Sequence, residues 1–255
     1  MIAITRPVSA SINECELTHL IREPIDVERA RLQHSAYEQA LAGAGCEIVR
    51  LDEAADLPDS VFVEDTAIVF DEVAIVTRPG AETRRRETAP VAEVLRRYRP
   101  VRLIEAPATI DGGDVVVAGR VVFIGQSRRT NAEAVGQMRR ILEAFGYEIR
   151  PVPVMSCLHL KSAATAFADG RLLINPGWAS KEAFPGLDVV EVDPREPEAA
   201  NVLRIGRDLI CADRFPHTRD RLERTGLAIW QLDMSELAKA EAAVTCCSLV
   251  FSHLT

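Results

Sequence analysis

Hydrophobic and polar positions repeat in a fixed order along the chain. Two short apolar runs joined by a polar or glycine-containing turn come first, followed by a stretch of helical character and then by one further apolar run. Paired runs of this kind are typical of a β-hairpin, and the spacing in the longer stretches is typical of a helix. The pattern therefore predicts a unit of hairpin, helix and strand that recurs several times.

Four such units can be recognised directly. Their hairpins are expected at 61–79, 114–125, 162–176 and 201–213. Their helical stretches are expected at 82–98, 128–145, about 178–184 and 216–225. Their last strands are VRLIEA, YEIRPVP, LDVVEVD and LAIWQLD. Together the four units account for most of the chain after residue 60.

The fifth unit is divided between the two ends of the sequence. Residues 245–251 and 1–7 can pair as its hairpin, with a helix at 26–44 and the strand CEIVRLD after it. Five units joined in this way can close into a ring, which removes exposed sheet edges. The alternative is an open α/β sheet with irregular hairpins, but the sequence has no glycine-rich nucleotide-binding motif that would support such a sheet.

Composition and charge restrict the classes of function. The 255 residues are 47% hydrophobic and 27% charged, which is enough for a buried core. A net charge of -8 argues against a nucleic-acid partner, because phosphate binding needs a basic surface, but it suits a small cationic ligand. No apolar run approaches the roughly 20 residues that span a bilayer, so we expect no membrane partner.

The six cysteines show neither C-x-x-C spacing nor a zinc-like cluster with histidine. Residues 1–10 have no basic segment followed by an apolar one, so no secretory signal is expected. We therefore expect a cytoplasmic protein with free thiols, no disulfide framework and no bound metal.

Four segments carry polar residues that are unusual for their positions. They are Asp59 to Asp65, Asp111-Gly112-Gly113-Asp114, His159-Leu160-Lys161-Ser162 and Thr245-Cys246-Cys247-Ser248. Each segment lies just before a predicted hairpin strand or at its start. We therefore expect all four at the same end of the ring, where a site would collect them.

The two adjacent cysteines are the candidate nucleophiles. In a strand, alternation would place Cys246 and Cys247 on opposite faces, and the ordinary interpretation of both is a small buried hydrophobe. A reactive cysteine needs a base or a cation beside it, and His159 is the candidate. Either Asp111 or Asp114 could orient that imidazole, as in a nucleophile–histidine–acid triad, and their spacing does not choose between them.

Seven motifs, taken in order, resemble those of the dimethylarginine dimethylaminohydrolase (dimethylargininase) family, within the superfamily of guanidino-group-modifying enzymes. They are Val61-Phe62-Val63-Glu64-Asp65, Thr77-Arg78-Pro79-Gly80-Ala81, Asp111-Gly112-Gly113-Asp114-Val115, Arg129-Thr130-Asn131, Leu158-His159-Leu160-Lys161-Ser162, Met234-Ser235-Glu236-Leu237 and Thr245-Cys246-Cys247-Ser248. The resemblance covers almost the whole chain. It implies one catalytic domain, residues 1–255, folded as a five-bladed α/β propeller whose terminal strands close the ring.

The resemblance also implies a role for individual residues. Cys246 matches the nucleophile, His159 the general acid and base, and Asp111 rather than Asp114 the orienting acid. Asp65 matches the carboxylate that binds the guanidinium group. The other implied substrate contacts are Asp59 and Glu64 as acids, Arg84 and Arg129 as a pair for the α-carboxylate, and Leu17 and Ala240 through their carbonyls. The loop around Leu17 is a candidate lid, and no cofactor is implied.

The implied reaction converts Nω,Nω-dimethylarginine or monomethylarginine to citrulline and an amine through a covalent S-alkylthiouronium group on Cys246. One alternative is an arginine or agmatine deiminase, or an amidinotransferase, with the same core. Those relatives tend to carry Arg-Asp where this chain has Glu64-Asp65, which favours the dimethylargininase. The other alternative is a non-catalytic arginine-binding propeller. Exposed helices and edges would allow a homodimer.

Overall fold

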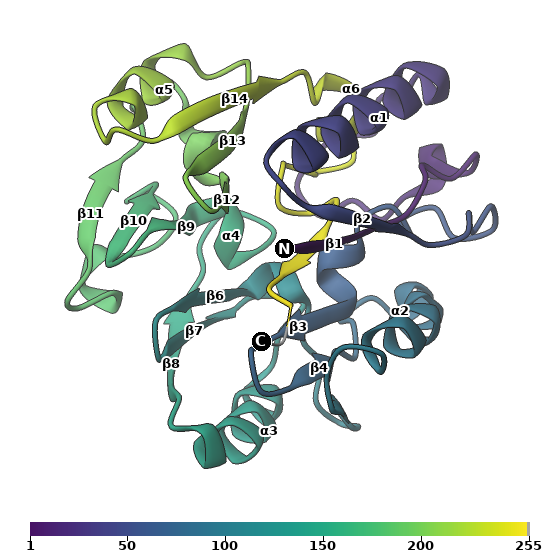
Figure 1. Cartoon of the computed structure of the whole chain (residues 1–255), viewed down its shortest axis with the longest axis vertical. Helices are drawn as coiled ribbons and strands as arrows, with labels where there is room; N and C mark the ends of the chain where they lie inside the picture. The colour runs from purple at the N-terminus through teal and green to yellow at the C-terminus, as the bar shows by residue number, and fades with distance from the viewer. Residues whose placement is uncertain (254–255) are drawn as a thin grey trace.

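Five small sheets are arranged in a ring in the computed structural model, which describes residues 1–253 (Figure 1). Every sheet has three strands and the same topology, in which a middle strand pairs antiparallel with one neighbour and parallel with the other. The antiparallel strands face one another around the ring, since β15 contacts β3, β6 contacts β9, and β9 contacts β12. The chain is therefore a five-bladed α/β propeller, and the open sheet is wrong.

Four units are continuous in sequence. Their strands are β3 (Ala67–Val69), β4 (Ala74–Val76) and β5 (Val101–Leu103); β6 (Val115–Ala118), β7 (Val121–Gln126) and β8 (Glu148–Pro153); β9 (Ala164–Ala168), β10 (Arg171–Ile174) and β11 (Asp188–Glu191); and β12 (Leu203–Ile205), β13 (Asp208–Ala212) and β14 (Ala228–Leu232). The helices that lead to their last strands are α2 (Thr88–Leu95), α3 (Ala132–Leu142) and α5 (Pro216–Glu223). In the third of these units a short 3-10 turn, Lys181–Ala183, takes the place of a longer helix.

The fifth unit joins the two ends of the chain, as the sequence predicts. Strand β15 (Leu249–Phe251) pairs antiparallel with β1 (Ile2–Thr5), and β1 pairs parallel with β2 (Glu47–Arg50). Helix α1 (Val27–Gly43) connects these two strands and is capped by Asp26, whose carboxylate accepts from the Arg29 amide at 3.1 Å. Gly45, with φ of +91°, provides the left-handed residue that ends the helix.

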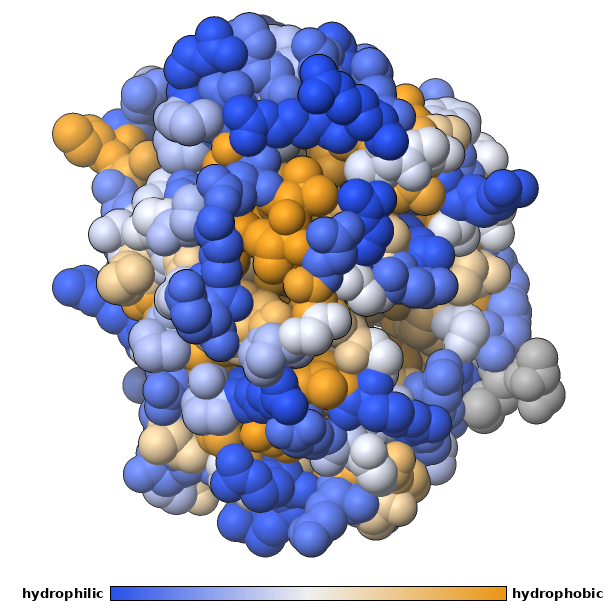
Figure 2. Space-filling model, turned by 90° about the vertical axis from the view of Figure 1, so that its left-hand side faces the viewer, coloured by the Kyte–Doolittle hydropathy of each residue, from blue (hydrophilic) through white to orange (hydrophobic). Residues whose placement is uncertain are grey.

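The apolar core is divided into clusters between neighbouring units. Ile2 and Ile4 of β1, for example, pack with Val91 and Leu95 of α2, which belongs to the next unit. Burying one such aliphatic side chain stabilises the fold by about 1.5–3 kcal/mol. Contacts of this kind therefore hold the units to one another. The outer face in Figure 2 is mainly hydrophilic, with a group of hydrophobic residues near its middle.

Several predicted strands begin later in the structure than in the sequence pattern. Val63–Thr66 and Gly112–Asp114 are 3-10 turns, and α4 (Leu160–Ala163) is a single helical turn before β9. The Glu64 amide donates to the Cys246 carbonyl at 3.1 Å, so its backbone is satisfied outside any strand ladder. Cys246 and Cys247 also lie in a turn before β15, and their placement in a strand is wrong.

The predicted helices are shorter than their sequence ranges. The stretch expected at 82–98 begins with a 3-10 turn, Glu82–Glu87, and α2 ends at Leu95. A further single turn, α6 (Ser235–Ala238), precedes the cysteine segment. Among residues 1–253 no helix is long and apolar enough to cross a membrane.

Candidate active site

All four polar segments meet at one pocket, at one end of the ring. The turns before β3, β6, β9 and β15 each contribute a lining residue, respectively Glu64, Gly113, His159 and Cys246. Of the residues expected at the site, those that line this pocket are Asp59, Glu64, Asp65, Arg84, Arg129, His159, Ala240 and Cys246. Asp111 lies behind His159, and the Leu17 side chain packs against an apolar cluster beside the pocket.

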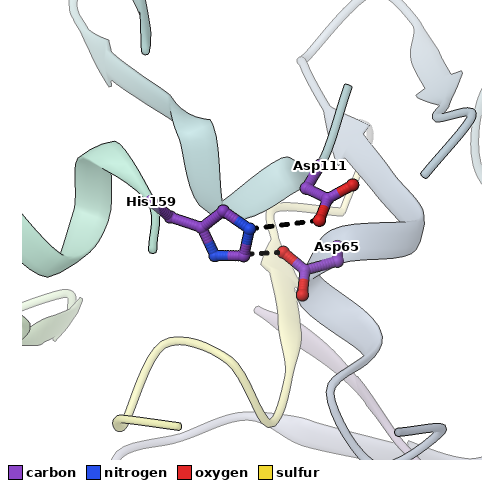
Figure 3. A group of neighbouring side chains, drawn as sticks. All are labelled: Asp65, Asp111 and His159. Carbon is purple, nitrogen blue, oxygen red and sulfur yellow. Dashed lines mark hydrogen bonds and ion pairs between the residues drawn. The ribbon is translucent and has the colours of Figure 1, made fainter. Parts of the chain in front are cut away.

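Figure 3 shows the carboxylates of Asp111 and Asp65 next to each other, on the same side of the His159 imidazole. Its Nε2 is 3.1 Å from Oδ2 of Asp111, and its Nδ1 is 3.9 Å from Oδ1 of Asp65. Burial alone would lower the pKa of His159, but the charge of Asp65 and the hydrogen bond to Asp111 outweigh it and raise that pKa to about 9. The imidazole is therefore a cation at neutral pH.

The Asp114 carboxylate has different hydrogen-bond partners from that of Asp111. Its Oδ2 accepts from Ser127 Oγ at 2.5 Å and from Thr130 Oγ1 at 2.7 Å, and its Oδ1 accepts from the Leu160 amide at 2.9 Å. Burial raises the pKa of Asp114 to about 6. Asp114 thus holds the backbone next to His159, whereas Asp111 contacts the imidazole itself.

The two glycines between these acids allow a close backbone approach. A Cβ on Gly113 would lie 2.5 Å from Nδ1 of His159, and one on Gly112 would lie 2.0 Å from the Glu64 carbonyl oxygen. Any larger residue would collide with the site. The sequence expectation that backbone comes close to another group here is confirmed.

Arg84 and Asp65 form a buried ion pair. Arg84 Nη1 donates to Asp65 Oδ2 at 2.6 Å, while Nη2 donates to Glu87 Oε2 at 2.9 Å and to the Phe62 carbonyl at 3.0 Å. Burial would raise the pKa of Asp65, but His159 and Arg84 lower it to about 2. Two residues expected at opposite ends of a ligand therefore contact each other, and most donors of Arg84 are occupied.

The two cysteines lie in different surroundings. Cys246 lines the pocket, and its Sγ accepts a long hydrogen bond of 3.4 Å from the Ala243 amide. Burial, together with the charges of Glu64 and Asp65, raises the pKa of Cys246 to about 12. Cys247 is fully buried in an apolar cluster. Without a ligand, the pocket therefore pairs a neutral thiol with a protonated imidazole.

Glu64 and Lys161 form the floor of the pocket. Lys161 Nζ donates to Glu64 Oε1 at 2.6 Å, and Thr245 Oγ1 donates to Glu64 Oε2 at 2.6 Å. A second cavity of about 250 Å³, lined largely by β3, β6, β9, β12 and β15, shares Glu64 and Lys161 with the pocket. Since both oxygens of Glu64 already have partners, this carboxylate closes the inner end of the pocket.

The opposite end of the pocket is covered by residues 16–20. The Glu241 carboxylate accepts from the Thr18 amide at 3.0 Å and from the Leu20 amide at 2.6 Å. Arg129 Nη2 donates to Thr18 Oγ1 at 3.2 Å, and the Glu16 amide donates to Asp59. The free volume left inside is about 30 Å³, close to that of one water molecule. The pocket is therefore too small for an amino acid in this conformation.

Asp65, Asp111 and His159 each offer a ligand atom within 4.8 Å of the others, a geometry that can hold a metal ion. A metal would need the neutral imidazole. With no ion bound, the raised pKa of His159 favours the protonated imidazole, which balances the two carboxylates.

Asn201 is a pocket residue that the sequence analysis missed. It lies after a 3-10 turn, Pro197–Ala200, and before β12, the first strand of its unit. Glu64 and His159 likewise lie just before the first strands of their own units. The repeat itself contains this signal, because Asn201 begins the fourth predicted hairpin. An amide is less conspicuous there than a carboxylate, a histidine or a cysteine.

Comparisons of this sequence with known proteins all lead to one family. A family model described as "N,N dimethylarginine dimethylhydrolase, eukaryotic" matches residues 3–164. An N(G),N(G)-dimethylarginine dimethylaminohydrolase of Streptomyces coelicolor is 41% identical over 254 residues, covering 99% of this chain and 97% of the relative. One from Pseudomonas aeruginosa is 38% identical over 228 residues, covering 89% and 90%.

Solved structures give the same result. A cysteine-to-serine variant of the Pseudomonas aeruginosa enzyme, in complex with citrulline, superimposes with a TM-score of 0.93, at 36% identity and with 98% of both chains covered. The similarity therefore extends from the sequence to the arrangement of the whole chain in space.

Proposed function

Because the chain belongs to the dimethylarginine dimethylaminohydrolase family, we propose that its pocket hydrolyses Nω,Nω-dimethylarginine, and also monomethylarginine, to citrulline and the corresponding amine. This proposal rests on one observation: Cys246, His159, Asp65 and Glu64 line the same buried pocket. A guanidinium group is a planar cation, and carboxylates are the acceptors that match its N–H donors.

The two ends of the pocket suit the two ends of the substrate. Asp65 and Cys246 lie at the inner end, where the guanidinium group would be held over the thiol. Arg129 and Asp59 lie at the covered end, where they would take the α-carboxylate and the α-ammonium group. Arg84 lies beside Asp59 and keeps little free donor capacity, so Arg129 is the main carboxylate partner in this proposal.

Attack by the thiol is the first step. A bound guanidinium cation offsets the carboxylates that disfavour the Cys246 thiolate, so the substrate itself promotes loss of the thiol proton to water, since His159 already carries its own proton. The thiolate forms a bond to the guanidinium carbon and cancels its charge. Protonated His159 then donates its proton to the dimethylamino nitrogen, and the C–N bond breaks with its electron pair going to dimethylamine. An S-alkylthiouronium cation remains on Cys246.

Hydrolysis of this adduct is the second step. His159 has become neutral and takes a proton from a water molecule, whose oxygen bonds to the thiouronium carbon. The C–S bond then breaks and the electron pair returns to Cys246 as a thiolate. The remaining O–H proton passes to this thiolate, which gives citrulline and restores the neutral thiol. General acid–base catalysis of this kind typically contributes about 10²–10⁴-fold.

The proposal is tested by product release with the native protein and with Cys246→Ser. The product measured is citrulline from dimethylarginine and from arginine, and N-carbamoylputrescine from agmatine. We expect citrulline from dimethylarginine and at least a roughly 10³-fold loss in the variant, since a hydroxyl replaces the nucleophilic thiol. Citrulline from arginine alone would instead identify a deiminase. No product from folded, reduced protein would point to a different guanidine substrate or to a binding module.

We also propose that the enzyme works in the reducing cytoplasm, because the reaction needs a free thiol and all six cysteines are unpaired. Cell fractionation tests this location. A homodimer stays a prediction, and light scattering of the purified protein at several concentrations decides it.

A further inference from the structure

Both the oxygen and the nitrogen of the Asn201 side-chain amide form hydrogen bonds to Thr245, in the segment that contains the proposed nucleophile. Its Oδ1 accepts from the Thr245 amide at 3.0 Å, and its Nδ2 donates to Thr245 Oγ1 at 3.0 Å. The same Nδ2 donates to the Lys161 carbonyl at 3.2 Å. Asn201 is only 5% exposed, so water does not replace these partners easily.

These contacts also fix the direction of the next hydrogen bond. Thr245 has one hydroxyl hydrogen, and its oxygen already accepts from Asn201. The hydroxyl must therefore donate to Glu64 Oε2, which lies 2.6 Å away. Lys161 Nζ donates to the other oxygen of Glu64. Asn201, Thr245, Glu64 and Lys161 thus form a closed cycle of hydrogen bonds, which we call the floor ring.

The floor ring connects the two segments that carry the reacting groups. Thr245 is bonded directly to Cys246, and Lys161 is two residues from His159. These segments belong to different units of the propeller, and Asn201 comes from a third unit. A shift of Asn201 would therefore change the distance between thiol and imidazole without touching either group.

We propose that Asn201 is a positioning residue for catalysis, which sets the placement of Cys246 relative to His159 through the floor ring. The proposal rests on the proposed function for its catalytic meaning. A displacement of about 1 Å at reacting atoms can cost roughly 100-fold in rate, whereas the proposed substrate contacts Asp65, Asp59 and Arg129 lie outside the floor ring. Loss of Asn201 should therefore reduce kcat and leave KM nearly unchanged.

The test compares Asn201→Ala with Asn175→Ala. Asn175 is the control because its amide is also buried, with 8% exposed. Its side chain donates to the Pro197 carbonyl at 2.9 Å and accepts from the Gly177 amide at 2.9 Å, and it makes no hydrogen bond to a member of the floor ring. We expect Asn201→Ala to lower kcat by about 10- to 100-fold with KM within about threefold. Asn175→Ala should lower the thermal midpoint by a similar amount and keep kcat, once activity is normalised to folded protein.

A second readout does not depend on the natural substrate. Chloroacetamidine is a cationic amidine that alkylates thiols, and its reaction with Cys246 needs the same approach of carbon to sulfur. We expect this alkylation to slow in Asn201→Ala and not in Asn175→Ala. If native protein releases no citrulline, the proposed function fails, while the alkylation rates still decide the role of Asn201.

Thr245→Val breaks the floor ring at another bond with little change in shape. If Asn201 acts through the ring, the double variant should lose no more than the more damaged single variant, because both changes remove the same linkage. Unchanged kcat in Asn201→Ala, equal kcat losses in Asn175→Ala, or fully additive effects of the two ring variants would each overturn the inference. Should Asn201→Ala not fold, Asn201→Ser takes its place, and the same three outcomes decide.

Discussion

Among single residues, the protonation states of Cys246 and His159 decide how the chemistry can begin. The thiol has a pKa of about 12 and the imidazole a pKa of about 9, so at neutral pH both groups are protonated. In the proposed mechanism the general acid is therefore ready before a ligand binds, whereas the nucleophile is not. We expect activation to come with the ligand, whose cation would enter next to Glu64 and Asp65.

This arrangement predicts two different pH profiles for one sulfur atom. Alkylation of the free protein by neutral iodoacetamide should keep rising from about pH 6 to about pH 10, because a pKa raised to about 12 leaves the thiol protonated throughout that range. With saturating substrate, kcat should reach its plateau at much lower pH, since a neighbouring cation lowers the thiol pKa. Cys246→Ser corrects for labelling of the other five cysteines. Equal midpoints in both experiments would refute activation by substrate.

Among the elements, the short turns before the antiparallel strands contribute most residues of the candidate site. The sequence predicted strands at several of these turns, so their secondary structure was the least well predicted. The run around Glu64 and Asp65 has the β-branched residues of a strand, yet their partners come from other units, and these partners hold it as a 3-10 turn. Local pattern predicted the strand pairs and the repeat, because those depend on alternation. The ion pair of Arg84 with Asp65 joins two turns of one unit that are 19 residues apart in sequence, and it has no local signal.

The segment over the pocket is a second element whose function can be tested. Glu241 has an unusual φ of +59° and accepts hydrogen bonds from the amides of Thr18, His19 and Leu20. Glu241→Gln removes its charge with little change in shape and should weaken these bonds. We expect faster tryptic cleavage after Arg22 in this variant, and slower cleavage when citrulline is added.

Glu223→Gln, on the surface of α5, is the control for this change of charge. Equal cleavage rates in native protein, control and Glu241→Gln would show that Glu241 does not hold the segment closed.

In the molecule as a whole, the pairing of β15 with β1 joins stability to activity. Leu249 of β15 is buried against Ile2 and Ile4, and Cys246 lies three residues before it. Replacing a buried leucine by alanine typically costs about 2–5 kcal/mol because a cavity remains. At this position the loss should also loosen the turn that holds the thiol.

We therefore expect Leu249→Ala to lower both the free energy of unfolding and kcat. Leu209→Ala, in β13 and also buried but in a different cluster, should lower the free energy of unfolding alone. Urea titrations give the first quantity, and citrulline release per folded molecule gives the second. If both variants keep native kcat, the closure of the ring does not position Cys246.

The pairing of β15 with β1 also determines when the protein can begin to work. A ribosome makes β1 first, and this strand has only β2 as a partner until residues 249–251 have been synthesised. The ribosome adds Asp65, Asp111 and His159 to the chain long before it adds Cys246. Throughout that interval the growing chain carries the acid and its carboxylates without a nucleophile, together with an unpaired strand edge of the kind that invites aggregation. The sheet of β15, β1 and β2 is therefore completed only by the segment that also brings the Cys246 thiol to the pocket.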